Sequence, residues 1–313
     1  MRKPLLLVAA IFSLFQAAVH SQETSKKTLH TLIIDPGHGG LDPGARGLLE
    51  SEANVALAVS LKLGDTLKKV FPDMKIIFTR TTDVLPGPIQ NKDAALKYRA
   101  NLANESGGDL FIAIHCNSAG RHPGGWYERR VVGKTAHTKI VKKKKRTYYT
   151  YEYENVWVEN KAKGTETYIW AMNKNDSKIN SVTKNNDYTG EIDSTSTLAL
   201  PDPTDPVEKA RMLIYAQYYF RKSLNLANYV QDEFKEVERI DRGVKQRNDK
   251  GIWVLQATGM PSILIEIGFI SNKEEEQYLI SDYGQSEIVR NIFTAIRKYK
   301  EKLESKGDEK KGF

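Results

Sequence analysis

Cysteine is almost absent from this chain of 313 residues, which contains only Cys116. A single thiol cannot form an internal disulfide, so the fold must be stabilised by its apolar core or in part by a bound metal. Long apolar runs are also missing, apart from one at the start of the chain.

Acidic residues number 39 against 47 basic ones, which gives a formal net charge of +8. This balance favours anionic partners, namely nucleic acid, acidic lipid or an acidic envelope polymer.

The apolar run at the start follows Arg2 and Lys3 and ends near Ala18. Its length and position are typical of a secretory signal peptide, residues 1–21, with cleavage before Gln22; a retained anchor is the alternative. We therefore expect an exported protein, in the periplasm or associated with the cell wall, whose mature chain has no transmembrane segment. Export makes nucleic acid the least expected of the anionic partners.

Strand-like and helix-like segments alternate along the rest of the sequence. Strands are predicted at 31–37, 74–80, 109–118, 251–258 and 261–269, and helices at 52–70, 91–106, 206–234 and 287–304. Such alternation predicts an α/β fold, a single domain with a largely parallel twisted sheet flanked by helices. We assign residues 28–304 to this domain and residues 305–313 to a flexible tail.

Two stretches interrupt the alternation, and we interpret both as insertions at the rim of the sheet. Residues 121–163 are first basic and then aromatic, with β-type residues in alternation. Residues 171–205 are polar and contain prolines near their end. The basic run at Lys142–Arg146 indicates either docking on an anionic wall polymer or membrane surface, or simply a solvated loop.

Polar side chains stand near the carboxyl ends of three predicted strands, the edge where open α/β sheets bind ligands. His38 follows the first strand in a glycine-rich loop, and His115 lies near the end of the strand 109–118. Glu266 interrupts the apolar run ILIEIGF, where an unpartnered carboxylate is costly to bury. Glu52 begins the helix after the glycine-rich loop, so its carboxylate could return toward His38. Singly, each histidine could belong to a core or a turn, and Glu52 could merely complement the helix dipole.

Together, two imidazoles and nearby carboxylates suit a catalytic zinc ion, which takes three N or O ligands and keeps one position open. The residues indicate His38, Glu52 and His115 as ligands, with Glu50 as the rival of Glu52, and Glu266 as general base. Non-haem iron would suit the same donors. The helical motif HExxH is absent, which excludes a thermolysin-like site.

Four segments of the chain resemble a known family. IIDPGHGGLDPGARG, ESEANVALAV, FIAIHCNS and PSILIEIGFISN, in this order, are similar to the signature segments of the zinc-dependent N-acetylmuramoyl-L-alanine amidases, the AmiC-like cell-wall hydrolases. FTRTTD at 78–83 and RANLAN at 99–104 also match stretches typical of that family. The resemblance covers about residues 31–118 and 164–304 and does not extend to the lysine-rich insertion.

The resemblance implies that one Zn²⁺ is bound by His38, Glu52 and His115 and that Glu266 is the catalytic glutamate. The family pattern E-x-D/N-x-x-L selects Glu52 over Glu50. The implied reaction is hydrolysis of the amide between N-acetylmuramic acid and the L-alanine of the peptidoglycan stem peptide, in wall remodelling or daughter-cell separation. Asn117 is our candidate for a hydrogen bond to the substrate.

The resemblance also raises the question of regulation. Some AmiC-like enzymes are kept inactive by a helix that lies across the zinc until a partner protein releases it. The segment 171–205 occupies the comparable place, and Glu191 or Glu208 could supply the blocking carboxylate, so an activator protein is a candidate partner. Alternative interpretations are another zinc amide hydrolase, such as a peptidase or a deacetylase of wall sugars, and an inactive wall-binding protein.

Overall fold

The computed structural model describes residues 28–88, 90–170, 205–246 and 252–308. The predicted signal peptide and almost all of the insertion 171–205 therefore lie outside the described residues. Contacts divide the chain into a main unit, His30–Tyr299, and a small unit whose described residues are Thr28, Leu29 and Lys300–Asp308. In the small unit Lys300 forms an ion pair with Glu304, one helical turn away. The main unit contains the sheet and every predicted site residue.

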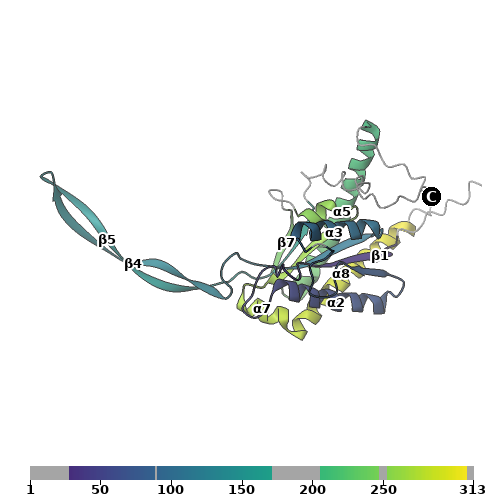
Figure 1. Cartoon of the computed structure of the whole chain (residues 1–313), viewed down its shortest axis with the longest axis horizontal. Coiled ribbons are helices and arrows are strands. Elements are labelled where there is room, and N and C mark those ends of the chain that lie inside the picture. Colours follow the sequence, from purple (N-terminus) through teal and green to yellow (C-terminus); the bar gives the residue numbers. More distant parts are fainter. Residues whose placement is uncertain (1–27, 89, 171–204, 247–251, 309–313) are drawn as a thin grey trace, which may run out of the picture. The chain divides into compact units, whose positions relative to one another are not determined.

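The main unit is built on a six-stranded sheet in the order β2-β1-β3-β8-β6-β7 (Figure 1). The strands are β1 (Thr31–Pro36), β2 (Lys75–Phe78), β3 (Leu110–Asn117), β6 (Thr165–Ile169), β7 (Asp241–Gln246) and β8 (Ser262–Phe269). The first four strands of this order run parallel, whereas β6 is antiparallel to β8 and parallel to β7. The predicted α/β fold with a largely parallel sheet is confirmed.

Helices cover both faces of the sheet; α2 and α7 lie on one face and α3 and α5 on the other (Figure 1). The helices are α2 (Glu52–Val70), α3 (Lys92–Glu105), α5 (Pro206–Glu236), α6 (Trp253–Ala257), α7 (Lys273–Ile280) and α8 (Asp282–Asp308). Asn91 caps α3 as its sequence predicts, because its side chain accepts hydrogen bonds from the backbone N–H groups of Asp93 and Ala94. Layers on both faces explain why the central strands β1 and β3 read as continuous apolar runs.

The core lies between the sheet and the helices on its two faces. It explains the regular spacing of apolar residues along the helical segments of the sequence. Along α2, the side chains of Val55, Val59, Leu63 and Leu67 are buried, one per turn. On the other face of the sheet, Phe111 of β3 belongs to a buried cluster that also contains Leu255 of α6. This packing places the carboxyl ends of β1, β3 and β8 at one edge of a rigid scaffold.

The predicted strand at 251–258 is wrong, because this segment contains the helix α6. A short apolar run does not distinguish a strand from a buried helical turn by its pattern alone. Here Val254 and Leu255 are both buried although they are consecutive, while Trp253 remains 42% exposed. The sequence also gave no strong signal for β6, β7 or α7, and the last helix begins at Asp282, five residues before its predicted start.

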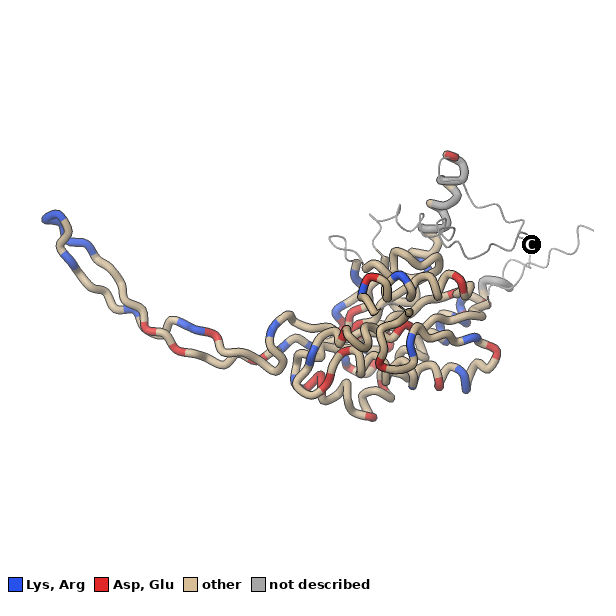
Figure 2. Tube along the Cα trace, in the orientation of Figure 1, with Lys and Arg blue, Asp and Glu red and all other residues tan. Residues whose placement is uncertain are grey.

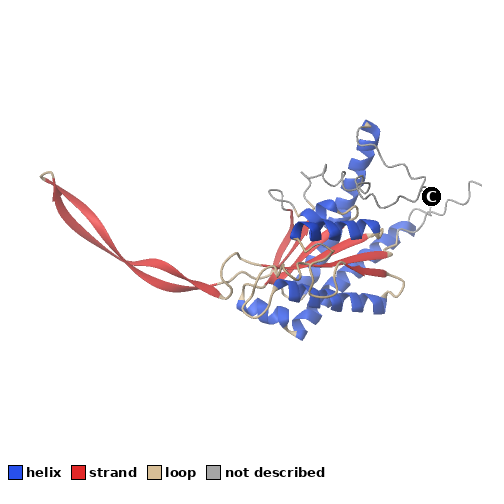
Figure 3. Ribbon diagram, in the orientation of Figure 1, coloured by secondary structure: helices blue, strands red, loops and turns tan. Residues whose placement is uncertain are grey.

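The stretch 121–163 contains a separate hairpin of two long strands, β4 (Gly125–Val141) and β5 (Lys144–Glu159) (Figure 3). We call residues 125–159 the ribbon. Its strands pair with each other in antiparallel register, and within the described residues neither belongs to the six-stranded sheet. Among the described helices, none has the length and apolar character needed to span a membrane.

Candidate metal centre

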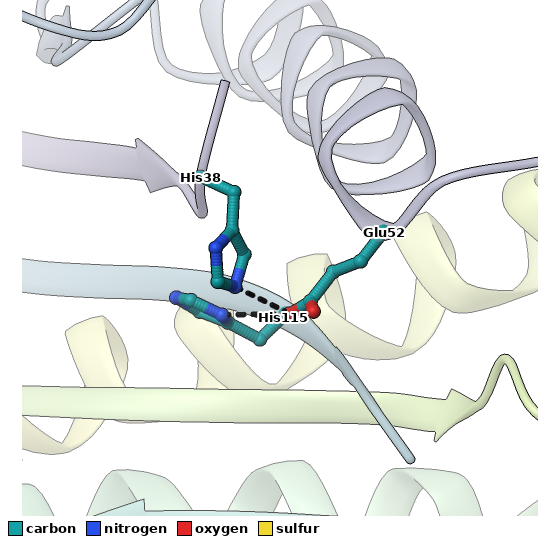
Figure 4. A group of neighbouring side chains, drawn as sticks. All are labelled: His38, Glu52 and His115. Carbon is teal, nitrogen blue, oxygen red and sulfur yellow. Dashed lines mark hydrogen bonds and ion pairs between the residues drawn. The ribbon is translucent and has the colours of Figure 1, made fainter. Parts of the chain in front are cut away.

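Three predicted site residues come together although they are far apart in the sequence (Figure 4). His38 lies in the loop after β1, Glu52 is the first residue of α2, and His115 lies near the end of β3. Oε1 of Glu52 lies 3.1 Å from Nε2 of His38 and 2.9 Å from Nδ1 of His115. One potential ligand atom from each residue lies within 4.8 Å of the other two.

The glycine-rich loop makes this approach possible by leaving room for the rings. A Cβ on Gly37 would lie 2.4 Å from the His115 ring. A Cβ on Gly44 would lie 2.5 Å from the Glu52 carboxylate, and the backbone there has a φ of +66°. His38 itself has a φ of 58°, a left-handed conformation that is uncommon outside glycine. Such a conformation persists only where surrounding contacts impose it.

Arg80 supplies one set of those contacts. Its side chain is buried, and it donates hydrogen bonds to the carbonyl oxygens of Pro36, Gly37 and Ala53 at 3.0, 2.7 and 2.7 Å. Burial and the neighbouring charge of Arg99 lower the pKa of Arg80 to about 10, so it remains a cation at neutral pH. This side chain therefore links the end of β1 to the first turn of α2, which carry His38 and Glu52.

Arg99 supplies the second set of contacts, from α3. It donates hydrogen bonds to the carbonyl oxygens of Pro36 and His38 at 2.8 and 2.6 Å, and it forms an ion pair with Asp35. Asp35 is 1% exposed and also accepts a hydrogen bond from Thr79. The aspartate at the end of the first strand thus has a positioning role: it binds the arginine that holds the His38 backbone.

Glu52 is buried, and both of its carboxylate oxygens accept hydrogen bonds from the protein. Its Oε2 accepts a hydrogen bond from the Ala45 N–H at 2.7 Å, and its Oε1 accepts one from the Cys116 N–H at 3.1 Å. Burial raises the pKa of the carboxyl, but the hydrogen bonds and charges of His115 and His38 lower it more, so its pKa lies well below 4.5. The site therefore holds a carboxylate. Glu50, the alternative ligand in the sequence analysis, instead accepts hydrogen bonds from Ser51 and Asn54.

Asp42 orients the His38 ring from the side opposite Glu52. Its Oδ2 lies 2.9 Å from Nδ1 of His38, and its other oxygen lies 2.5 Å from Nζ of Lys92. Burial lowers the pKa of His38, but the carboxylates of Glu52 and Asp42 outweigh this and raise its pKa above 6.5. A carboxylate on one ring nitrogen directs the other nitrogen to a metal, which is the usual arrangement behind metal-binding histidines.

Glu266 lies beside His115 in the sheet. The register pairs Glu266 of β8 with His115 of β3 on one side and with Glu166 of β6 on the other. Residues paired in register present their side chains on the same face of a sheet. The histidine and the two glutamates therefore form a row across three strands, with Glu266 in the middle.

Glu166 is the centre of a polar cluster that sequence analysis did not identify. It is 2% exposed. Its oxygens lie 2.5 Å from Nε of Arg242 and 2.8 Å from Nζ of Lys245, and they accept hydrogen bonds from Tyr168 at 2.7 Å and Asn117 at 3.1 Å. The predicted substrate contact, Asn117, is thus bonded to Glu166, next in the row to Glu266. No motif in β6 or β7 marked this cluster; only the sheet register reveals it.

The donors are of the kinds that zinc binds, and the two separations that involve Glu52 are close to those that zinc requires. Zinc binds imidazole nitrogen and carboxylate oxygen at about 2.0–2.2 Å, which requires ligand atoms about 3–4 Å apart. The distances from Oε1 of Glu52 to the two imidazole nitrogens, 3.1 and 2.9 Å, are close to this requirement. His38, Glu52 and His115 have side chains that are 24%, 6% and 17% exposed. An ion among them would be held by protein on one side and remain reachable from the other.

Comparison with known proteins identifies the family of the chain. The family model for N-acetylmuramoyl-L-alanine amidases, Amidase_3, matches residues 32–298. The chain belongs to this amidase family. Its match to AmiC of Escherichia coli is 25% identical over 272 residues and covers 86% of this chain but 52% of AmiC, so the chain spans about half of that relative.

Solved amidase structures share the fold. The N-acetylmuramoyl-L-alanine amidase from Clostridium difficile 630 is 24% identical, with a TM-score of 0.53, and the match covers 87% of this chain and 97% of that one. The CwlD amidase from Clostridioides difficile, solved in complex with the GerS lipoprotein, is 23% identical, with a TM-score of 0.54, and the match covers 86% and 98%. At identities below 25%, these structures show that the chain shares the amidase fold.

Proposed function

We propose that this amidase-family chain hydrolyses the amide bond between N-acetylmuramic acid and the L-alanine of the peptidoglycan stem peptide. One observation carries the proposal: the donors of His38, Glu52 and His115 converge beside Glu266 at one edge of the sheet. His38, Glu52 and His115 would hold one zinc ion. When bound, zinc supplies a Lewis acid that polarises a carbonyl and makes water more acidic.

The chain's own residues divide the remaining work. Glu266 is the general base: its carboxylate takes a proton from the attacking water and returns it to the amine nitrogen of L-alanine as the C–N bond breaks. Proton transfer of this kind contributes about 10²- to 10⁴-fold in rate. Asn117 binds the substrate beside it, oriented by its hydrogen bond to Glu166.

Paired variants test the two roles. Glu266→Gln keeps the shape of the side chain but removes the base, so we expect metal content to stay unchanged while turnover of purified muropeptides falls about 10²- to 10⁴-fold. His115→Ala should lose both metal and turnover. Glu50→Gln is the matched control, because Glu50 accepts hydrogen bonds from Ser51 and Asn54. This variant should retain both its metal and its turnover. A fully active Glu266→Gln variant would contradict the assignment of the base.

Product analysis tests the reaction itself. Mass spectrometry of muropeptides should show free stem peptide and intact glycan, and a chelator should abolish the reaction. Shortened peptides would indicate a peptidase, and free amino sugars a deacetylase. Restoring the chelated protein with zinc or with ferrous iron distinguishes the two metals that these donors suit.

We further propose that residues 1–21 are a signal peptide, that the enzyme acts in the periplasm or at the cell wall, and that it serves wall remodelling or daughter-cell separation. An activator protein is also proposed, with the segment 171–205 as the blocking element. The CwlD–GerS complex gives a precedent for an amidase of this fold with a protein partner. Deletion of 176–200 should raise basal activity; unchanged activity would argue against autoinhibition.

A further inference from the structure

The ribbon has no role in the site described above. Its two strands pair from Gly125 with Glu159 to Val141 with Lys144, with one register shift between Val131 and Gly133. Every residue from Lys142 to Asn155 is exposed. An isolated two-stranded hairpin is at best marginally stable in water. A hairpin that is this long and this exposed therefore requires an explanation.

One face of the ribbon carries exposed aromatic rings. Tyr149, Tyr151, Tyr153 and Trp157 are separated by even numbers of residues along β5, so they share a face, and they are 47–50% exposed. Cations flank these rings: Arg129 lies 3.9 Å from the centre of the Tyr153 ring, and Lys134 lies 3.9 Å from that of Tyr149. These contacts stabilise the ribbon and leave about half of each ring open.

The half of the ribbon nearest its turn is strongly basic (Figure 2). Between Lys134 and Tyr151 there are seven basic residues and no acidic one. The acidic residues of the ribbon, Glu128, Glu152, Glu154 and Glu159, lie outside this interval. An unopposed positive field of this kind attracts polyanions and is sensitive to salt.

The turn itself retains lysines where the backbone favours other residues. Lys142 and Lys143 both have positive φ, 53° and 60°, as in a two-residue type I′ turn. Asn-Gly fits such a turn best, because positive φ strains residues that carry a Cβ. Backbone geometry therefore does not favour these two lysines, which add two positive charges at the turn of the ribbon.

We propose that the ribbon binds the glycan strands of peptidoglycan. The aromatic face would stack on sugar rings, whose C–H groups are apolar, and the cations would pair with the carboxylates of the stem peptides. This inference rests on the proposed function, because it gives the ribbon the same polymer that the metal centre cuts. Bound there, the ribbon raises the local concentration of scissile bonds at the active site.

The distribution of side chains favours a polymer over a membrane. From Tyr149 to Trp157 the aromatic face extends for roughly 27 Å along the strand. A membrane-binding hairpin would instead gather its aromatic rings at one depth, as interfacial belts do. Residues 142–146 at the turn are all basic and include no apolar side chain that could insert into lipid.

The test compares two variants with the same change in charge. The turn variant is Lys142→Asn, Lys143→Gly, Lys144→Thr and Lys145→Thr, which suits the type I′ turn and keeps β-type residues in the strand. The control replaces four exposed lysines outside the ribbon, Lys68, Lys69, Lys75 and Lys97, with Gln. A third variant, Tyr149→Thr, Tyr151→Thr and Tyr153→Thr, removes the rings. Circular dichroism verifies that each variant is folded.

Binding is measured by sedimentation with purified sacculi, in a Glu266→Gln background so that the polymer stays intact. We expect the turn and ring variants each to bind about tenfold more weakly at low salt, and the control less than twofold. With Glu266 present, turnover of a small soluble muropeptide should be equal in all of them. Failure to cleave that muropeptide would refute the proposed function, whereas sedimentation reports on the ribbon separately.

Two results would overturn the inference. One is equal sedimentation of the turn variant and the control. The other is binding to vesicles of phosphatidylglycerol and phosphatidylcholine, lost in the turn variant, without binding to sacculi, which would identify a lipid surface as the partner.

Discussion

The loop around His38 and the ribbon both lie outside the six-stranded sheet, but they are held in opposite ways. The His38 loop has a strained backbone, and two buried arginines bind its carbonyl oxygens. The ribbon is regular in its hydrogen bonding and is exposed over most of its length. Chemistry at a metal requires ligands fixed within fractions of an ångström, whereas attachment to a long polymer requires only a charged surface with exposed rings. Substitutions should therefore have large effects in the loop and small effects on folding in the ribbon.

The largest effect on stability is expected at the Asp35–Arg99 ion pair. Arg99→Met leaves a buried carboxylate without its cation, so we expect the free energy of unfolding to fall by about 3–5 kcal/mol. The double variant Asp35→Asn/Arg99→Met should recover part of this loss, because no unpaired charge remains. Urea denaturation of the single and double variants measures both. A single variant no less stable than Arg146→Ala, on the exposed ribbon, would contradict the positioning role.

A smaller effect is expected at Asp42, which orients His38 without joining the three proposed ligands. Asp42→Asn keeps the size of the side chain but removes its charge, and we expect metal affinity to fall about 10- to 100-fold. Lys92→Met is the control, because it removes the neighbour of Asp42 and leaves the carboxylate on His38. Competition with a chromophoric chelator measures both affinities. Equal losses in the two variants would argue that Asp42 acts only through its ion pair.

The acid stability of the fold should depend on Glu166. Burial raises the pKa of this carboxyl, but Lys245, Arg242 and Tyr168 outweigh it, so its pKa lies below 4.5. The folded state therefore holds the proton less tightly than the unfolded state. The resulting stability is complete above about pH 4.5 and is lost as the pH falls through the lower, folded-state pKa. Between pH 7 and pH 3 the melting temperature should fall less steeply for Glu166→Gln than for the parent. Identical slopes in the two proteins would refute this.

The smallest effect is expected in the ribbon. The lysine and tyrosine substitutions described for it change only exposed side chains, so we expect the free energy of unfolding to shift by no more than about 0.5 kcal/mol. Urea denaturation followed by circular dichroism checks this. A loss of several kcal/mol would show that the ribbon supports the main fold, and the contrast with the His38 loop would then fail.

The sequence by itself determined the parts of this protein that depend on local pattern. Strict spacing of apolar residues predicted α2 from Glu52 to Val70, and the apolar runs predicted β1, β3 and β8. Polar residues at the ends of buried strands stood out for the same reason, since burial without a partner is costly. The grouping of His38, Glu52 and His115 followed from the rule that parallel strands end at a common edge and from the family resemblance.

Only the tertiary structure decided the features that depend on contacts between distant segments. The segments FTRTTD and RANLAN resemble the family in sequence, but only the structure shows that their arginines, Arg80 and Arg99, bind the His38 loop. The row from His115 through Glu266 to Glu166 exists only because β6 pairs antiparallel with β8. The helix α6 likewise stands where a strand was expected, because a short apolar run suits either element and does not decide between them. Local patterns constrain neighbours in the chain, whereas sheet order and register arise from the packing of the whole fold.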